Sequence, residues 1–254
     1  MNANDGDELI RCLVIAGWDP TAGAGALADC EALGWLGARP LVALTTVTAQ
    51  NRRRVLHPQP VAARRLERQL EAISESGRID AVKIGLLGTA ANCRVVERWL
   101  EAGVAGRVPV VLDPVVRASS GGMLAEPTLV GQLRRLLRLV DVVCPNAYEA
   151  GLLAGMGSVP MGMQRRISAA RKLALQGPAV VVTGGDTRRI ARDILVRGDD
   201  VLELRATRIP KQAPGTGCRF TAALACLLAG GRDLIPAVRR AAKLVRRYIH
   251  SYAG

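Results

Sequence analysis

The sequence predicts an α/β protein with one central, mostly parallel β-sheet that carries helices on both faces. Short, almost continuously apolar runs alternate along the chain with longer segments whose apolar residues recur at helical spacing. The chain has 254 residues, of which 49% are apolar and 3% aromatic, with 27 glycines. This composition suits helices that pack closely on strands around a sizeable core.

No linker, repeat or low-complexity tract divides the chain, and we expect one domain over residues 1–254. Residues 1–8 are polar and acidic, so we expect a flexible N-terminus there and not a signal peptide.

Strands are predicted where the apolar runs are short and end at turn residues. Pro114 and Pro145 end two of them, because proline has no N–H to donate to a sheet. The predicted strands cover residues 9–17, 39–47, 81–88, 109–114, 141–145 and 178–185, and a hairpin covers residues 192–204 around Gly198.

Helices are predicted where apolar residues recur every three or four positions between charges. Gly103 ends one helix, and Pro127 lies near the start of another. The predicted helices cover residues 27–37, 61–73, 89–103, 127–139, 217–231 and 233–252, with one or two more between 147 and 176. Ligands of such folds bind in the loops after the carboxyl ends of the strands, so unusual residues in those loops are candidates for a site.

Composition also disfavours several classes of partner. A formal net charge of +13 can attract nucleic acid, membranes or anionic metabolites. The sequence has no nucleic-acid module and few aromatic residues for base stacking, so we expect no nucleic-acid partner. No run of about 18 apolar residues occurs, so we expect no membrane span. The six cysteines form no CxxC pair and no metal-ligand spacing with the two histidines, which fits a reducing cytoplasm.

Two polar clusters follow the first two predicted strands. Gly17, Gly23 and Gly25 in the segment AGWDPTAGAGALAD permit close approach of a ligand to the backbone, and Asp19 adds a carboxylate. A glycine-rich turn in which Asp19 caps the next helix explains this segment equally well. Gln50 ends the segment TTVTAQN with Asn51, where amide groups can bind the edge of a heterocycle or simply form a polar strand exit.

A third cluster combines carboxylates and an amide at neighbouring strand ends. Asp113 follows one strand, and Asn146 and Glu149 follow the next in the segment CPNAYEA. Together they can hold Mg²⁺ against phosphates, partly through water. Helix N-capping is the alternative explanation for Asn146.

The fourth cluster, PGTGC, precedes a strongly helical segment. Backbone N–H groups of Gly215, Thr216 and Gly217 at a helix N-terminus predict an anion site suited to phosphoryl transfer. Cys218 lies in the first helical turn, where we expect a lowered thiol pKa and a role as acceptor of a substrate proton. A glycine-rich loop with a buried cysteine is the alternative.

The clusters occur in the order found in hydroxymethylpyrimidine/phosphomethylpyrimidine kinases, and the sequence resembles that family from about residue 9 to 250. The motifs are AGWDPTAGAGALAD, VALTTVTAQN, AVKIGLL, VLDPV, CPNAYEA and PGTGC. The resemblance implies a ribokinase-like fold and a homodimer. It also implies ATP- and Mg²⁺-dependent phosphorylation of 4-amino-5-hydroxymethyl-2-methylpyrimidine and of its monophosphate in thiamine biosynthesis.

The resemblance also implies roles for individual residues. The catalytic group comprises Cys218 with the backbone of Gly215, Thr216 and Gly217. The substrate contacts are Gly17, Asp19, Ala24, Gln50 and Leu86. ATP and its phosphates are expected at Asn146, Thr183, Gly185, Arg219 and Lys243, and the metal at Asp113 and Glu149.

Several residues depart from the family pattern, which leaves other functions open. Pro214 and Arg219 flank the GTGC loop where the family often has His and Thr, and Thr183 replaces a frequent Lys. Arg219 either adds charge near the phosphates or points to solvent. Ala22 replaces a common Gly, and Leu86 a frequent Met. The alternatives are a pyridoxal-type vitamin kinase on the same fold, a catalytically weak pyrimidine-binding relative, and a basic nucleic-acid binder.

Overall fold

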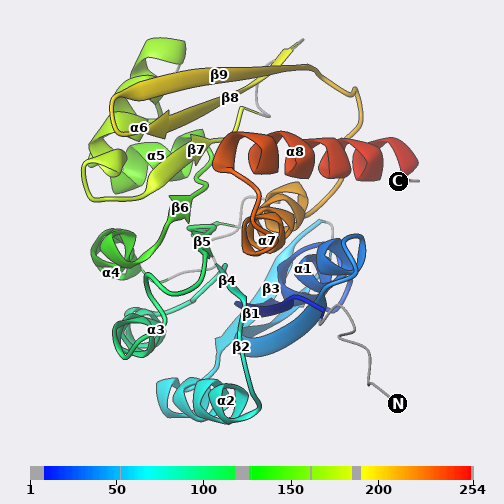
Figure 1. The fold of residues 1–254 in the computed structure, drawn as a ribbon, viewed down its shortest axis with the longest axis vertical. Coiled ribbons are helices and arrows are strands. Elements are labelled where there is room, and N and C mark those ends of the chain that lie inside the picture. Colours follow the sequence, from blue (N-terminus) through cyan, green and yellow to red (C-terminus); the bar gives the residue numbers. More distant parts are fainter. Residues whose placement is uncertain are drawn as a thin grey trace, which may run out of the picture.

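The computed structural model describes residues 9–51, 53–117, 126, 128–160, 162–184 and 190–252. Its centre is a nine-stranded sheet with the order β3-β2-β1-β4-β5-β6-β7-β8-β9 (Figure 1). The six neighbouring strands β2, β1, β4, β5, β6 and β7 are parallel to one another. Strand β3 is antiparallel to β2 at one edge of the sheet, and at the other edge β8 is antiparallel to both β7 and β9. The predicted mostly parallel α/β fold is confirmed.

The strands are β1 (Arg11–Trp18), β2 (Arg39–Gln50), β3 (Val55–Pro60), β4 (Ala81–Ile84), β5 (Val110–Leu112), β6 (Val142–Val143), β7 (Ala179–Val182), β8 (Ile190–Arg197) and β9 (Asp200–Thr207). The helices are α1 (Gly25–Gly34), α2 (Ala63–Glu75), α3 (Ala90–Glu101), α4 (Leu129–Leu136), α5 (Ala147–Leu153), α6 (Met163–Ala174), α7 (Thr216–Ala229) and α8 (Leu234–Ser251), with a short 3₁₀ helix at Leu137–Leu139. None of these described helices combines the length and the apolarity that a bilayer span requires.

Both faces of the sheet are covered, which explains why the apolar runs are nearly continuous. Along β1, Leu13 and Ile15 belong to a core shared with helices α2 to α6. The alternate residues Cys12 and Val14 belong to a second core, shared with α1, α7 and α8. Figure 1 shows these two helical layers on opposite sides of the sheet. A strand buried on both faces needs apolar residues at every position.

Strand β3 was not predicted. Its residues are mostly exposed, and it contains two prolines, which interrupt any alternating pattern. Pro58 lies opposite Thr48, and Pro60 lies opposite Thr46, in an antiparallel pair with β2. Proline is tolerated on an edge strand because the outer side of the ladder needs no donor. Only the position of this segment at the sheet edge makes it a strand.

The order of the strands creates a crevice at their carboxyl ends. The chain passes from β1 through α1 to β2 on one side, and then returns to β4 on the other side of β1. This reversal between β1 and β4 is a topological switch point, where the connecting loops diverge and leave room for a ligand. Helix α7 packs against β1, β4 and β5, and its N-terminus lies among the residues at this crevice.

A fully buried ion pair joins α1 to the sheet beside the crevice. The Lys83 ammonium lies 2.7 Å from an Asp29 carboxylate oxygen, and neither side chain is exposed to solvent. Burial raises the pKa of Asp29 to about 6, against the opposing effect of Lys83. Burial tends to lower the pKa of Lys83, but the nearby Asp29, Cys218 and Asp113 outweigh it and raise that pKa. Both partners are therefore charged at neutral pH.

We expect Asp29→Asn to lower the free energy of unfolding by about 3 kcal/mol, because it leaves the buried Lys83 charge without its partner. The double variant Asp29→Leu/Lys83→Met should recover most of that loss, because it removes both charges. Urea unfolding followed by circular dichroism measures both changes. A loss below about 1 kcal/mol in Asp29→Asn would show that the pair contributes little.

Candidate active site

A cavity of about 290 Å³ lies at the carboxyl ends of the strands, where the chain reverses direction across the sheet. Residues from all four polar clusters of the sequence line it, although they are far apart along the chain. The predicted site residues that line it are Gly17, Asp19, Ala24, Gln50, Leu86, Asp113, Asn146, Glu149, Thr183, Gly215, Thr216, Gly217 and Cys218.

The first loop is held in shape by Asp19. One Asp19 carboxylate oxygen accepts hydrogen bonds from the Thr21 N–H (2.9 Å) and hydroxyl (2.8 Å), and the other accepts from the Ala24 N–H (2.9 Å). Asp19 is only 5% exposed. Ala24 is the N-cap residue of α1, so Asp19 holds the turn that leads into this helix, which is the alternative role that the sequence left open. A side chain at Gly25, whose φ is +62°, would collide with the Gly17 carbonyl oxygen.

The second cluster presents Gln50 and Leu86 to the cavity. Gln50 is half-buried at the end of β2 and lines the cavity with Leu86, which is 7% exposed. Asn51 also lines the cavity, but its side-chain oxygen accepts the N–H groups of Arg53 and Arg54. Asn51 therefore shapes the turn, and Gln50 is the better candidate to bind the edge of a ring.

The third cluster brings two buried carboxyl groups into one electrostatic environment. Asp113 is 6% and Glu149 is 4% exposed. Burial raises the pKa of Asp113, with Lys83 and hydrogen bonds to Cys218 and Thr221 opposing it. Burial and the charge of Asp113 raise the pKa of Glu149 to about 8. A cation at this place would favour the ionised form of both groups.

Asn146 also has the capping role that the sequence left open. Its side-chain oxygen accepts the Glu149 N–H (2.9 Å), and a Glu149 carboxylate oxygen accepts the Asn146 N–H (3.0 Å). This capping box starts α5 and fixes Glu149 against the cavity. A parallel bridge between Asn146 and Thr183 brings Thr183 to the same wall. Gly185, predicted to bind phosphate, lies outside the described residues.

The fourth cluster forms the N-terminus of α7. Gly215 has a φ of +62° and is the N-cap residue, followed by Thr216 and Gly217 in the first turn. Among the described residues, the N–H groups of these three residues donate to no other protein group. Three backbone donors at a helix N-terminus thus remain available to an anion in the cavity.

The predicted lowering of the thiol pKa at Cys218 is wrong. The thiol lies in the first turn of α7 at the cavity and is half-buried. Burial raises its pKa to about 12; Lys83 opposes this shift, whereas Asp29 and Asp113 add to it. Loss of water and two nearby carboxylates therefore outweigh the helix terminus, and the thiol is protonated at neutral pH.

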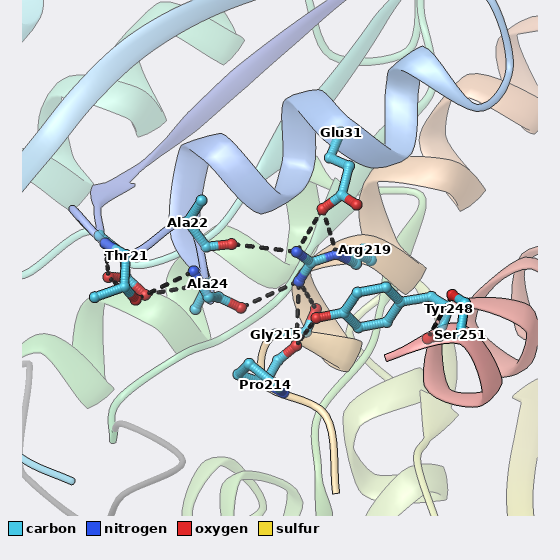
Figure 2. A network of polar contacts seen from close by, with 11 residues as sticks. Thr21, Ala22, Ala24, Glu31, Pro214, Gly215, Arg219, Tyr248 and Ser251 are labelled. Atoms are coloured by element: carbon cyan, nitrogen blue, oxygen red, sulfur yellow. Dashed lines mark hydrogen bonds and ion pairs between the residues drawn. The ribbon is translucent and has the colours of Figure 1, made fainter. Parts of the chain in front are cut away.

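Two predicted phosphate-binding residues do not line the cavity. Arg219 is 2% exposed, and its guanidinium binds Glu31 and backbone carbonyl groups of two loops, as Figure 2 shows. It therefore points neither to the phosphates nor to solvent. Lys243 is exposed on α8, outside the cavity lining. The phosphate contacts expected of both residues are not supported.

Sequence reasoning missed Lys83 and Arg117, which both line the cavity. Lys83 lies within the apolar strand AVKI, and a lysine in a strand buried on both faces was a usable signal, because such a charge needs a partner. Arg117 lies with its guanidinium carbon 5.0 Å from the centre of the Tyr148 ring. Nothing in the local sequence placed it at the cavity.

Comparison with known proteins identifies the family of the chain. The family model described as phosphomethylpyrimidine kinase matches residues 19–253. The hydroxymethylpyrimidine/phosphomethylpyrimidine kinase of Rhizobium meliloti is 35% identical over 242 residues, which cover 94% of this chain and 88% of that protein. The chain belongs to the phosphomethylpyrimidine kinase family.

A thiamine biosynthesis multifunctional protein (ThiED) of Corynebacterium efficiens is 36% identical over 228 residues, or 88% of this chain. The matched region spans only 30% of that longer relative. Among solved structures, the pyridoxal kinase of Staphylococcus aureus in complex with AMP-PCP and pyridoxal superposes with a TM-score of 0.85 at 30% identity. The match covers 95% of this chain and 88% of that one. Both the fold and the sequence thus connect the chain to vitamin kinases.

Because the pKa of Glu149 is raised in the folded protein, the free energy of unfolding should depend on pH. Its ordinary pKa is 4.5, and in the folded protein the pKa is about 8. The folded protein therefore holds the Glu149 proton more tightly than the unfolded chain does. The stability that this proton contributes is complete below about pH 4.5 and is lost as the pH rises through about 8. Glu149→Gln keeps a capping side chain but cannot ionise.

We expect the free energy of unfolding of the wild type, relative to Glu149→Gln, to fall by a few kcal/mol between about pH 5 and pH 9. Urea unfolding in the presence of a chelator, at several pH values, measures this difference. Parallel pH profiles for the two proteins would contradict the raised pKa.

Proposed function

We propose that the chain is an ATP-dependent kinase that phosphorylates 4-amino-5-hydroxymethyl-2-methylpyrimidine, its monophosphate, or both, in thiamine biosynthesis. The observation that carries this proposal is the cavity, in which three unused backbone N–H groups of the GTGC loop share one space with Asp113 and Glu149. Membership of the phosphomethylpyrimidine kinase family and the 35% identity to the Rhizobium meliloti enzyme support the substrate class.

The chemistry follows from the charges at this site. The N–H groups of Gly215, Thr216 and Gly217 bind the oxygens of the transferred phosphoryl group and stabilise the charge that develops on it. When bound, ATP would supply the phosphoryl group and Mg²⁺ would neutralise charge on the ATP phosphates. Asp113 and Glu149 fit Mg²⁺, because magnesium sites use one or two carboxylates together with substrate phosphates. Within the described residues, no group of three or more acidic, Cys or His side chains offers a cation site formed by protein alone.

Cys218 is our candidate for the group that receives the proton of the substrate hydroxyl. Lys83 favours the thiolate form that this role requires, against the effect of burial. Because the pKa of the thiol is raised to about 12, we expect kcat to increase with pH above neutrality.

Cys218→Ala should lower kcat about 100-fold and remove this alkaline increase, since a general base contributes about that much. The dissociation constant of ADP should be nearly unchanged, because the backbone donors remain. Cys226→Ala, on the same helix but in the second core, is the matched control and should keep the wild-type pH profile. Full activity of Cys218→Ala would assign the chemistry to the loop backbone and Mg²⁺ alone.

The main test is phosphorylation of hydroxymethylpyrimidine by the purified protein with ATP and Mg²⁺, with mono- and diphosphate products resolved. We expect both products from the alcohol and the diphosphate from the monophosphate. Monophosphate alone would define a kinase restricted to the first step. Pyrimidine binding without any product would instead support the catalytically weak relative.

Pyridoxal kinase activity is the second candidate, and the structural similarity to the Staphylococcus aureus enzyme favours it. The two activities are separated by comparing kcat/KM for pyridoxal and for hydroxymethylpyrimidine in the same assay. We expect the pyrimidine to be preferred, since Gln50 can donate to and accept from an aminopyrimidine edge.

We further propose that residues 1–254 act as one kinase domain, that the chain forms a homodimer, and that it works in the cytoplasm. The continuous nine-stranded sheet supports the single domain. Exposed apolar side chains on β2 and β3, namely Val42, Val47 and Leu56, support an interface at that edge. Six free cysteines suit a reducing compartment. Light scattering coupled to size-exclusion chromatography measures the oligomeric state.

A further inference from the structure

Arg219 lies in the first turn of α7, and residues of two other helices hold its guanidinium. Its Nε and Nη2 atoms donate to one carboxylate oxygen of Glu31 on α1, at 3.0 Å and 2.5 Å. The ring of Tyr248 on α8 lies against it, with 4.1 Å between the guanidinium carbon and the ring centre. A planar guanidinium with a carboxylate at one edge and an aromatic ring at its face has one orientation.

The remaining donors of Arg219 all bind carbonyl oxygens of the two loops at the cavity. Nη1 donates to the carbonyls of Gly23 and Pro214, both at 3.1 Å, and to that of Gly215 at 3.4 Å. Nη2 donates to the carbonyl of Ala22 at 3.2 Å. Figure 2 shows the guanidinium between the first loop and the GTGC loop. One side chain thus joins the glycine-rich loop after β1 to the loop before α7.

The direction of these carbonyls determines the direction of the neighbouring N–H groups. In a planar trans peptide, the C=O of one residue and the N–H of the next point in opposite directions. The first loop shows this: the Gly23 carbonyl faces Arg219, and the following Ala24 N–H faces Asp19, 2.9 Å away.

The same rule applies to the GTGC loop. The carbonyls of Pro214 and Gly215 face the guanidinium, so the N–H groups of Gly215 and Thr216 point away from it. Both residues line the cavity. The Gly215 carbonyl also accepts the backbone N–H of Arg219 at 3.0 Å, and the Pro214 carbonyl accepts the Tyr248 hydroxyl at 3.1 Å. The Arg219 side chain therefore supports, together with these two bonds, the orientation that presents the Gly215 and Thr216 donors to an anion.

The backbone of both loops needs this support. Ala22 has a φ of +54° and is the only residue other than glycine with a positive φ among those described. A left-handed conformation is unfavourable for a residue with a side chain, because its Cβ comes too close to the following carbonyl oxygen. Gly215 also has a positive φ, and a methyl group there would collide with the Gly23 carbonyl and with Arg219. The two loops are in contact, and the hydrogen bonds of the guanidinium stabilise the left-handed conformations of Ala22 and Gly215.

We propose that Arg219 is a positioning residue that orients the Gly215 and Thr216 N–H groups and couples the first loop to the GTGC loop. It acts from behind the loop backbone, without touching a phosphate. The effect on turnover rests on the proposed kinase function, whereas the effect on the backbone does not.

The test compares Arg219→Met and Arg219→Lys with the wild type. Arg68→Met, which removes an equal charge from an exposed ion pair on α2, is the matched control. Backbone ¹⁵N relaxation reports the order parameters of Gly215, Thr216 and Ala24. We expect these values to fall from about 0.85 to below about 0.6 in both Arg219 variants and to stay unchanged in the control. Arg219→Lys should not restore them, because one ammonium cannot reach carbonyls on both loops and Glu31 together.

Kinetics provide the second measurement. In Arg219→Met we expect kcat to fall about 100-fold, as when an oxyanion donor is lost, while the KM values for ATP and pyrimidine change less than about fivefold. Partial unfolding would also lower the apparent kcat without changing KM, so circular dichroism must show that the variant is folded and kcat is expressed per folded molecule. If Arg219→Met does not fold, Glu31→Gln keeps the guanidinium but weakens its anchor. It should then lower the same order parameters and reduce kcat about tenfold.

The outcomes are distinguishable. Wild-type order parameters at Gly215 and Thr216 in a folded Arg219 variant, or in Glu31→Gln if Arg219→Met does not fold, would overturn the inference. Wild-type order parameters in Arg219→Lys would also overturn the inference, because they would show that a positive charge at this position is sufficient. Absence of turnover in the wild type would overturn the proposed function, and the relaxation data would still decide the role of Arg219.

Discussion

Lys83 is the charge on which the electrostatics of the cavity depend. It has no exposed surface, it pairs with Asp29 at 2.7 Å, and it lies close enough to Asp113 and Cys218 to act on their pKa values. Isolated carboxylates in this environment would be costly to ionise. With Lys83 in place, the protein can keep carboxyl groups at the carboxyl ends of buried strands, where its ligand must bind.

The charges around Lys83 set a condition for binding an anion in the cavity. Asp29 satisfies the ammonium, so Lys83 does little to neutralise a phosphate. Ionised Asp113 and Glu149 would repel a bare phosphate, and burial raises the pKa of both carboxyl groups. In the proposed kinase, Mg²⁺ held by Asp113 and Glu149 would offset this repulsion, because a cation attracts carboxylates and phosphates together. The backbone N–H groups of Gly215, Thr216 and Gly217 would then bind the phosphate oxygens.

Much of the architecture was predictable because it depends on short-range patterns. Strands buried on both faces require apolar residues at every position, and most of the helices carry apolar residues on one stripe. The convergence of Asp113, Asn146 and Gly215 follows from the parallel order of the strands, since all their carboxyl ends meet at one edge. Strand β3 could not be predicted, because its two prolines and exposed residues carry no strand pattern.

The properties that were predicted wrongly, or not at all, depend on contacts between distant residues. A cysteine at a helix N-terminus has a lowered pKa when water and positive charge surround it, but at Cys218 burial and two carboxylates decide the sign. An arginine beside a phosphate-binding loop can bind the phosphate or the loop. Which of these occurs depends on Glu31, which is 188 positions away along the chain.

The role of Arg219 illustrates how such competition is decided. A guanidinium has five N–H donors, and burying it requires acceptors for nearly all of them. A phosphate is present only when a ligand binds, whereas Glu31 and the carbonyls of Ala22, Gly23 and Pro214 are always present. Permanent acceptors and the Tyr248 ring therefore fix the side chain behind the loop. The positive charge still favours anion binding there, because it keeps carbonyl dipoles turned away from the cavity and N–H dipoles turned toward it.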